Sequence, residues 1–357
     1  MKRILFFALI FVIVAFALAS CDSSKNAEKE YIFDAEDHWI KGENEKENHR
    51  FNDEKCNICG FNKAYTVGVE YELSHDMSFY YVIGYTGSSE IVVIEKEVDG
   101  IPVTSIMSNS FSKRSGIKKI IIPDSVTEIR MYAFAYCTDL ESIVIPDSVV
   151  NASGYLFTGC EKLSDIVFPD GIRLTNLESF QGTAYYNNEA NWDNGVLYVG
   201  KHLIKVDENY SGTLVIRDGT QTIASDALKN CENIEEVVIP STVKTIGMDA
   251  FKGCKSLKSI NIPESVIQIS SGAFRDCTSL EEVVLSENLQ LIYSYAFKGC
   301  EKLAKIIIPS TVIEVGNEAF GGCPELVIYC RFSNRPIGWS ATWIGGSNEV
   351  HWNYTGE

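Results

Sequence analysis

The sequence predicts a strand-dominated α/β solenoid, in which 23-residue coils stack so that their strands form a parallel β ladder. Two observations support this fold class. The chain is 45 % hydrophobic and 22 % charged, which is a globular composition. One pattern of apolar, small and turn-forming residues also recurs every 23 residues, and a single such coil can bury its apolar side chains only by stacking on others. The blocks begin at Ile120, Ile143, Ile166, Val237, Ile260, Val283 and Ile306.

The N-terminus carries the pattern of a secretion signal over residues 1–20. Lys2 and Arg3 precede the uncharged run "ILFFALIFVIVAFAL", and small residues lead to Cys21. This ending resembles a bacterial lipobox, which implies that Cys21 is acylated and that the protein is a lipoprotein of the cell envelope. An uncleaved transmembrane anchor is the alternative, but the run is shorter than the ~20 apolar residues that span a bilayer.

Residues 21–60 are polar and charged, and we interpret them as a tether between the lipid and the folded part. Within this tether, Cys56 and Cys59 form a CxxC knuckle, with His38 and His49 upstream. Cys and His at short spacing are typical ligands of a structural zinc ion. A local disulfide and the absence of any special role are the alternatives, because a complete zinc site normally contains a second closely spaced pair.

Residues 61–106 are expected to form N-terminal strands and a degenerate first coil, and residues 107–328 contain the repeats. In "SINIPESV", Ile260 and Ile262 alternate inward on a short strand. Pro263 lacks a backbone donor and ends that strand. Val266 and Ile269 are expected to return to the core before the next corner of the coil.

Three columns of this corner recur in register along the chain. A buried aromatic residue is expected at Phe111, Phe134, Phe157, Phe180, Phe251, Phe274, Phe297 and Phe320, with Leu228 in the same place. Cysteines recur at Cys137, Cys160, Cys231, Cys254, Cys277, Cys300 and Cys323. Their Cβ vectors would point the same way, which is poor disulfide geometry, so we predict buried free thiols. A left-handed backbone is predicted at the place before the cysteine column, which holds Gly159, Gly182, Asn230, Gly253, Asp276, Gly299 and Gly322. Tyr136 breaks this pattern of Gly, Asn and Asp.

The repeat is interrupted near 184–216. The segment "NGVLYVGKHLIKV" is typical of a hairpin that turns at Gly200 and Lys201. The following stretch, 207–218, has residue spacing similar to that of an EF-hand calcium loop. Its flanks are predicted to be strands and not helices, so we interpret it as a polar loop. At the other end of the chain, residues 329–357 are rich in aromatic side chains that would cover the last coil, namely Trp339, Trp343, Trp352 and Tyr354.

Two columns of the ladder are expected to face outward. The first column is polar and contains Lys119, Ser142, Asp165, Glu236, Ser259, Glu282 and Lys305. The second column contains Ile121, Val144, Val167, Val238, Asn261, Val284 and Ile307. An exposed row of β-branched residues reflects either ordinary strand propensity or a docking surface, and the sequence leaves both interpretations open.

The motif "LxxIxIPxSVxxIxxxAFxxC", which covers about residues 69–357, resembles the BspA-like leucine-rich repeat family of bacterial surface proteins. The resemblance implies a leucine-rich repeat solenoid, a location on the cell surface, and adhesion to host or cell-surface proteins.

The predicted function is therefore that of a non-catalytic, lipid-anchored surface protein that binds a macromolecule along its ladder. No catalytic motif or cofactor fingerprint occurs, so we expect neither an enzyme nor a cofactor, other than the zinc considered above. The net charge of −17 argues against nucleic acid and against anionic membrane surfaces beyond the lipid anchor. The alternative is a glycan-binding or envelope-structural lipoprotein, in which Tyr185, Tyr186 and Trp192 stack on sugars; hairpin packing is the competing explanation for these three side chains.

Overall fold

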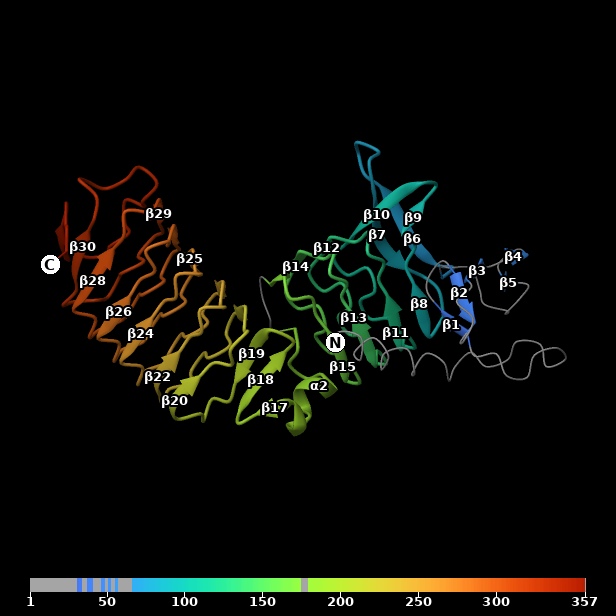
Figure 1. The fold of residues 1–357 in the computed structure, drawn as a ribbon, viewed down its shortest axis with the longest axis horizontal. Helices are drawn as coiled ribbons and strands as arrows, with labels where there is room; N and C mark the ends of the chain where they lie inside the picture. The colour runs from blue at the N-terminus through green and yellow to red at the C-terminus, as the bar shows by residue number, and fades with distance from the viewer. Residues whose placement is uncertain are drawn as a thin grey trace.

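The computed structural model describes residues 66–174 and 179–356, together with five short strands between residues 31 and 56 (Figure 1). These strands are β1 (Tyr31–Phe33), β2 (Asp37–Ile40), β3 (Lys46–Asn48), β4 (Phe51–Asn52) and β5 (Lys55–Cys56). β1, β2 and β3 form an antiparallel sheet, and β4 pairs with β5.

The repeat region begins with the N-terminal strands that the sequence predicts. β6 (Val69–Leu73) and β7 (Tyr80–Tyr85) are antiparallel, and β10 (Ile101–Ile106) runs parallel to β7. β9 (Glu97–Val98) pairs with the start of β10 in an antiparallel turn. Because β10 has the same direction as the strands of the coils that follow, it is the first strand on which they stack.

Each coil contributes two strands, so the structure contains two parallel ladders, where the sequence analysis anticipated one. The first ladder contains the strand that ends before the proline, and in the N-terminal half its members are β8 (Ile91–Val93), β11 (Lys119–Ile121), β13 (Ser142–Val144) and β15 (Asp165–Val167). The second ladder extends β10 with the short strands β12 (Glu128–Ile129), β14 (Asn151–Ala152) and β16 (Arg173–Leu174). These second strands form where the chain returns to the core after the proline turn.

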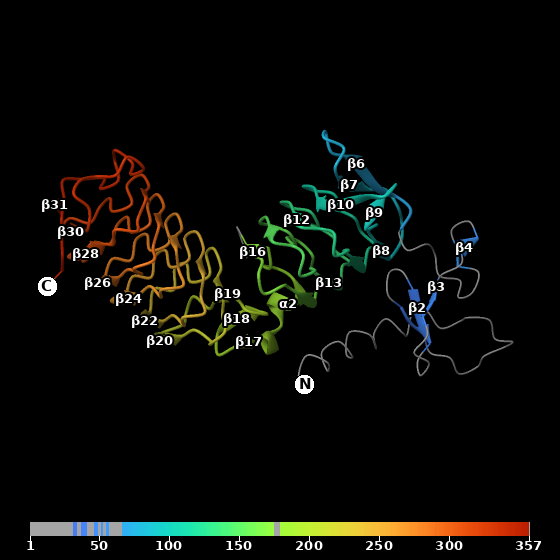
Figure 2. The same ribbon diagram turned by 45° about the horizontal axis from the view of Figure 1, so that its top comes forward.

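The predicted hairpin is present and divides both ladders into two halves. After α2 (Ala184–Asn187) and a 3₁₀ turn (Glu189–Asn191), β17 (Trp192–Asp193), β18 (Val196–Val199) and β19 (His202–Val206) form an antiparallel meander. Val199 pairs with His202, which confirms the turn at Gly200 and Lys201. β15 and β16 end the sheets of the N-terminal half, so Figures 1 and 2 show two stacks of coils with the hairpin between them.

Both ladders begin again after the hairpin, in the C-terminal half. Its first ladder contains β20 (Gly212–Val215), β22 (Ile234–Val238), β24 (Ser259–Asn261), β26 (Glu282–Val284), β28 (Lys305–Ile308), β30 (Val327–Cys330) and β31 (Glu349–His351). Its second ladder continues from β19 through β21 (Thr222–Ile223), β23 (Thr245–Ile246), β25 (Gln268–Ile269), β27 (Leu291–Ile292) and β29 (Glu314–Val315).

Stacked phenylalanine rings run through the core of both halves. In the C-terminal half, the ring centroids of Phe251 and Phe274 are 4.9 Å apart, and those of Phe274 and Phe297 are 5.3 Å apart. In the N-terminal half, Phe111 and Phe134 stack at 5.8 Å. All these rings are fully buried, so the prediction that matching columns lie in neighbouring layers is confirmed.

The corner before each cysteine is left-handed, as the glycine, asparagine and aspartate column predicts. Asn230 has φ 62° and Asp276 has φ 59°. Tyr136, which breaks the residue pattern, is left-handed as well, since its φ is 60°, and its amide donates to the carbonyl of Thr158 in the next coil. A second left-handed position lies four residues earlier in each coil, and it includes Tyr132, Tyr155, Asp226, Asp249, Gly272, Tyr295 and Glu318.

The cysteine column consists of buried free thiols, as expected. Each thiol also has a hydrogen-bonding role that the sequence did not indicate, because it donates to a carbonyl of the preceding coil. Sγ of Cys137 lies 3.0 Å from the carbonyl oxygen of Phe111, and Sγ of Cys277 lies 3.1 Å from that of Phe251. Burial raises the pKa of Cys277 to about 12, so this thiol remains protonated at neutral pH.

An aromatic cluster covers the last coil, as the sequence predicts. Trp343 packs edge-on against Phe320, with ring centroids 5.9 Å apart, and Trp339 lies 4.9 Å from Trp343. Trp352 contacts both tryptophans. Trp339 and Trp343 are each 3 % exposed, so this cluster closes the end of the hydrophobic core.

Candidate binding surface

The outward side chains of the first ladder form a continuous row in each half. Strand alternation turns every second residue away from the core, and the parallel register then places equivalent residues side by side. Ile121 pairs with Val144, Val215 with Val238, and Asn261 with Val284. We call this row the apolar stripe, and its members are Ile121, Val144 and Val167 in the N-terminal half and Val215, Val238, Val284 and Ile307 in the C-terminal half.

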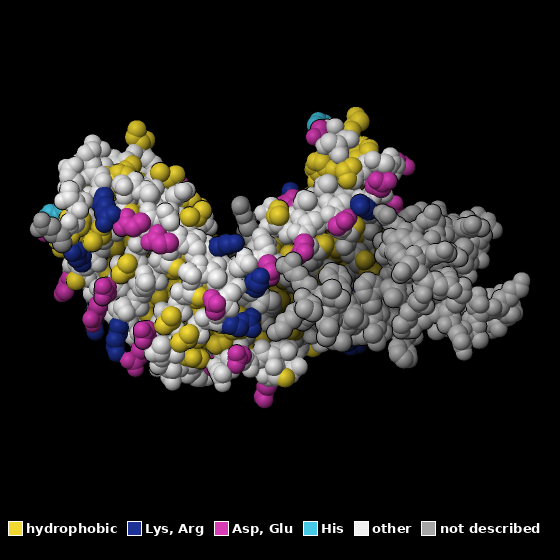
Figure 3. All heavy atoms as spheres, viewed as in Figure 1, with side chains coloured by type: hydrophobic (Ala, Val, Ile, Leu, Met, Phe, Trp, Pro, Cys, Tyr) yellow, Lys and Arg dark blue, Asp and Glu magenta, His cyan; other side chains and the backbone are white. Residues whose placement is uncertain are grey.

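Most of the apolar stripe is accessible to solvent. Val238 is 44 % exposed and Val284 is 49 % exposed, whereas Val167 and Ile307 are half-buried. Asn261 lies in the same row and is also exposed. Figure 3 shows that hydrophobic side chains are mixed with acidic and basic ones over this face of the C-terminal half.

Three residues in atypical coils, namely Val215, Tyr329 and His351, extend the row beyond the positions identified from the sequence. Val215 is 67 % exposed and pairs directly with Val238, but no proline follows its strand to mark it. At the other end, Tyr329 pairs with Ile307 and His351 pairs with Tyr329. The row therefore begins one strand before the C-terminal coils identified from the sequence and ends on aromatic side chains.

The polar column that flanks the apolar stripe carries both charge signs. Asp165, Glu236, Ser259, Glu282 and Lys305 are exposed, whereas Lys119 and Ser142 are half-buried. The ammonium group of Lys305 lies 5.0 Å from the ring centroid of Tyr329 and 5.6 Å from that of Tyr354. Tyr329 also stacks on His351 at 4.9 Å. The C-terminal end of the row is thus an aromatic cluster that carries both charge signs, because Nε2 of His351 lies 3.0 Å from Oε1 of Glu349.

The three aromatic residues considered for sugar stacking are anchored in the hairpin insertion. The hydroxyl of Tyr185 donates to the carbonyl oxygen of Tyr198 at 2.7 Å, and Nε1 of Trp192 donates to that of Tyr186 at 2.7 Å. The rings of Tyr186 and Trp192 pack edge to face at 5.3 Å. These contacts support the hairpin-packing explanation for Tyr185 and Trp192, whereas Tyr186 also borders a pocket.

The structure describes no side chain of the predicted lipidation and zinc residues. Cys21, Cys59 and His49 lie outside the described residues, and for His38 and Cys56 only the backbones of β2 and β5 are described. Within the described residues, no group of three or more His, Cys, Asp or Glu side chains is arranged to hold a metal ion. The part of the chain covered by the structure also contains no helix that is long and apolar enough to cross a bilayer.

Only the first part of the calcium-like stretch 207–218 is a polar turn. Residues 207–211 follow β19, and Gly212–Val215 is strand β20, so the interpretation of the whole stretch as a loop is wrong for its second part. The Oδ1 atom of Asp207 accepts hydrogen bonds from the backbone and side-chain nitrogens of Asn209 at 2.8 and 3.1 Å. This carboxylate oxygen is used within the turn.

The histidine of the hairpin is buried and serves to join two segments of the fold. Nε2 of His202 lies 3.0 Å from the carbonyl oxygen of Pro169, and the side chain is fully buried. Burial lowers the pKa of His202 below its ordinary value. A neutral ring that donates to a backbone carbonyl holds β19 against the last coil of the N-terminal half.

Comparisons with known proteins agree with this architecture. A sequence model described as "BspA type Leucine rich repeat region" matches residues 94–205 and 208–327 in six copies. No curated protein sequence matches the chain significantly. The match is to a repeat region and not to a catalytic family.

Several solved structures of bacterial leucine-rich repeat proteins are similar to the chain. A T. pallidum leucine-rich repeat protein is 25 % identical, with 72 % of this chain and 87 % of that chain covered and a TM-score of 0.27. A leucine-rich repeat protein from Bacteroides ovatus is 18 % identical over 80 % and 98 % of the chains, with a TM-score of 0.34. A leucine rich cell surface protein from Faecalibacterium prausnitzii is 19 % identical over 81 % and 94 %, also with a TM-score of 0.34. Since the family model matches well over half of the sequence, the chain belongs to the BspA-type leucine-rich repeat family.

Proposed function

We propose that this protein is a non-catalytic surface lipoprotein, anchored through Cys21, that adheres to a host or cell-surface protein through the apolar stripe. The observation that carries the proposal is the row of exposed β-branched side chains held in register across the first ladder. Scattered exposed apolar residues are normal on soluble proteins, but contiguous apolar surface rimmed by polar residues is typical of interaction sites.

The geometry of the row matches that of a protein interface. Neighbouring strands lie about 4.8 Å apart, so the row in the C-terminal half extends for roughly 25 Å. Protein interfaces combine an apolar centre with a charged rim, and aromatic residues are enriched in them. Val238 and Val284 would supply the centre, Glu236 and Glu282 the rim, and Tyr329 the aromatic group. Since the chain carries a net charge of −17, a partner with a neutral or basic face is favoured.

The test compares two double substitutions in the full-length protein. In the first, Val238→Lys and Val284→Lys place charges at the centre of the apolar stripe. In the control, Ile267→Lys and Ile313→Lys place the same charges at residues that are 47 % and 62 % exposed but lie beside the second ladder. Binding to cells and to extracellular matrix is measured by surface plasmon resonance or adhesion assay, and circular dichroism checks folding.

We expect the first variant to bind at least about tenfold more weakly, a loss of ~1.4 kcal/mol, and the control to bind normally. Equal binding by the first variant would exclude this face. For the location, protease treatment of intact cells should remove the protein, and Cys21→Ala should release it from the membrane fraction; protection from the protease would contradict a role in adhesion.

The alternative function, glycan binding, is supported by one observation. Of the three aromatic residues in the insertion, Tyr186 borders a pocket with several polar side chains.

A further inference from the structure

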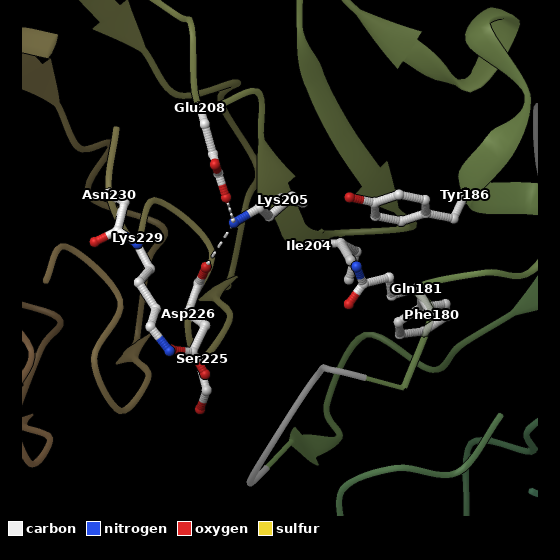
Figure 4. Close-up of a pocket in the computed structure, with 10 residues that line it drawn as sticks. All are labelled: Phe180, Gln181, Tyr186, Ile204, Lys205, Glu208, Ser225, Asp226, Lys229 and Asn230. Atoms are coloured by element: carbon white, nitrogen blue, oxygen red, sulfur yellow. Dashed lines mark hydrogen bonds and ion pairs between the residues drawn. The ribbon is translucent and has the colours of Figure 1, made fainter. Parts of the chain in front are cut away.

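A pocket of about 240 Å³ lies where the hairpin joins the N-terminal half to the C-terminal half (Figure 4). Phe180 and Gln181 end the last coil of the N-terminal half, Tyr186 belongs to α2, and Lys205 belongs to β19. Asp226 comes from the first coil of the C-terminal half. The pocket therefore exists because the insertion brings together residues that the regular repeat would keep apart.

The charged groups around this pocket are paired with one another. Nζ of Lys205 lies 3.7 Å from Oε1 of Glu208 and 3.4 Å from the carbonyl oxygen of Asp226. Nζ of Lys229 lies 2.8 Å from Oδ1 of Asp226. Two cations thus face two carboxylates, and the site has no net charge to offer an ionic ligand. A neutral ligand avoids the desolvation cost of an unmatched charge.

Two uncharged polar groups, on the exposed Gln181 and the half-buried Tyr186, border the same space without a hydrogen-bond partner among the described residues. Figure 4 shows the hydroxyl of Tyr186 and the side-chain amide of Gln181 on the side opposite the Lys205–Glu208 pair. Within the described residues, neither group makes a hydrogen bond to another side chain or backbone atom. An amide offers two donors and one acceptor oxygen, and a phenol hydroxyl can both donate and accept. These groups are suited to a ligand that carries several hydroxyls.

Contacts with Thr183 and Trp192 hold Tyr186 in place. Its backbone amide donates to Oγ1 of Thr183 at 3.1 Å, its carbonyl accepts from Trp192, and its ring packs against the Trp192 ring. Burial raises the pKa of Tyr186, so the hydroxyl stays protonated. A fixed aromatic ring bordering a polar pocket provides an apolar surface at a low cost in conformational entropy.

We infer that this pocket binds one neutral sugar ring, such as the terminal hexose of a glycan. A pyranose combines hydroxyls, which can bond Gln181, Tyr186 and the paired charges, with a C–H face that can lie against an aromatic ring. The volume is below the ~300–1,000 Å³ of pockets for drug-sized ligands, which suits a single ring. The site is separate from the apolar stripe, so the two can be disrupted independently.

The test uses the full-length protein and the methyl glycosides of glucose, galactose, mannose and N-acetylglucosamine. Saturation-transfer NMR identifies any that bind, and calorimetry gives the affinity. Gln181→Leu removes the amide at similar volume, and Tyr186→Phe removes the hydroxyl but keeps the ring. Gln290→Leu makes the same change at an exposed position in another coil and serves as the matched control.

We expect at least one glycoside to bind the wild type and the control equally, with about fivefold or greater weakening in Gln181→Leu and Tyr186→Phe. The lysine substitutions at Val238 and Val284 should leave this affinity unchanged, which distinguishes the pocket from the proposed adhesive face. The inference is overturned if no methyl glycoside binds, if both pocket variants bind like the control, or if inorganic phosphate competes for the site.

Discussion

Replacing Phe297 with alanine tests the ring stack that supports the whole solenoid. Phe297 is fully buried, its centroid lies 5.3 Å from that of Phe274 and 5.5 Å from that of Phe320, and the planes are within 7° of parallel. Burial of a phenylalanine contributes ~3–5 kcal/mol relative to alanine. The neighbouring layers cannot close the gap, because the amide of Phe297 donates to the carbonyl of Ala319 at 2.8 Å and fixes the spacing. We therefore expect a loss of ~4–5 kcal/mol.

Phe297→Leu is the matched control, since Leu228 occupies the same column and is also fully buried. Its expected cost is ~1–1.5 kcal/mol, because leucine fills most of the space. Urea unfolding followed by circular dichroism gives both free energies, and hydrogen exchange reports whether the loss is local to the C-terminal coils, as nearest-neighbour stacking requires. A loss below ~2 kcal/mol in the alanine variant, or an equal loss in both variants, would refute the stacking argument.

Three further predictions concern the corner, the hairpin and the thiols. Gly159→Ala should cost ~2 kcal/mol in urea unfolding, because φ is 74° and the new Cβ would lie 2.5 Å from the ring of Tyr136; in a Tyr136→Gly background the cost should fall to ~1 kcal/mol. The stability of the protein should decrease as the pH falls below 6.5, because the lowered pKa of His202 makes the unfolded state bind a proton first, and His202→Gln should weaken this decrease. Native Cys277, with a pKa of about 12, should resist iodoacetamide at pH 8 and react in urea, as read by peptide mass spectrometry.

Each of these three predictions has a result that would contradict it. An unchanged cost of the Gly159 substitution in the Tyr136→Gly background would show that the ring does not restrict the corner. The same pH dependence between 7.5 and 5 in wild type and His202→Gln would assign the acid sensitivity to other groups. Labelling of native Cys277 at the rate of a free thiol would mean that the coil opens or that the thiol is not buried.

The repeated pattern makes the coil itself predictable. Ile260, Ile262, Val266 and Ile269 are buried as expected, because each faces an equivalent apolar residue in the coils above and below. The position of a side chain follows from its column when it packs against the equivalent side chain 23 residues away. The same reasoning placed the Phe274 and Cys277 columns and the outward position of Val238.

Residues that depart from the type common to their column are less predictable. Tyr136 breaks the pattern of Gly, Asn and Asp at the left-handed corner, yet it adopts the same conformation, and its amide donates to Thr158 in the next coil. Val215, which belongs to the apolar stripe, and Tyr329, which continues its row, were both missed. Their strands lack the repeat motif and join the row only by pairing with Val238 and Ile307.

The sequence by itself determined the period, the identity of the core and the side of each strand that faces outward, because these follow from local alternation repeated at one fixed spacing. Tertiary structure decided the second ladder, the division of both ladders at the hairpin and the pocket between the halves. Those features depend on segments that do not resemble each other, such as His202 in contact with Pro169, or Gln181 and Asp226, which line one pocket. A periodic pattern specifies how a coil meets its copy, and only packing specifies how it meets an insertion.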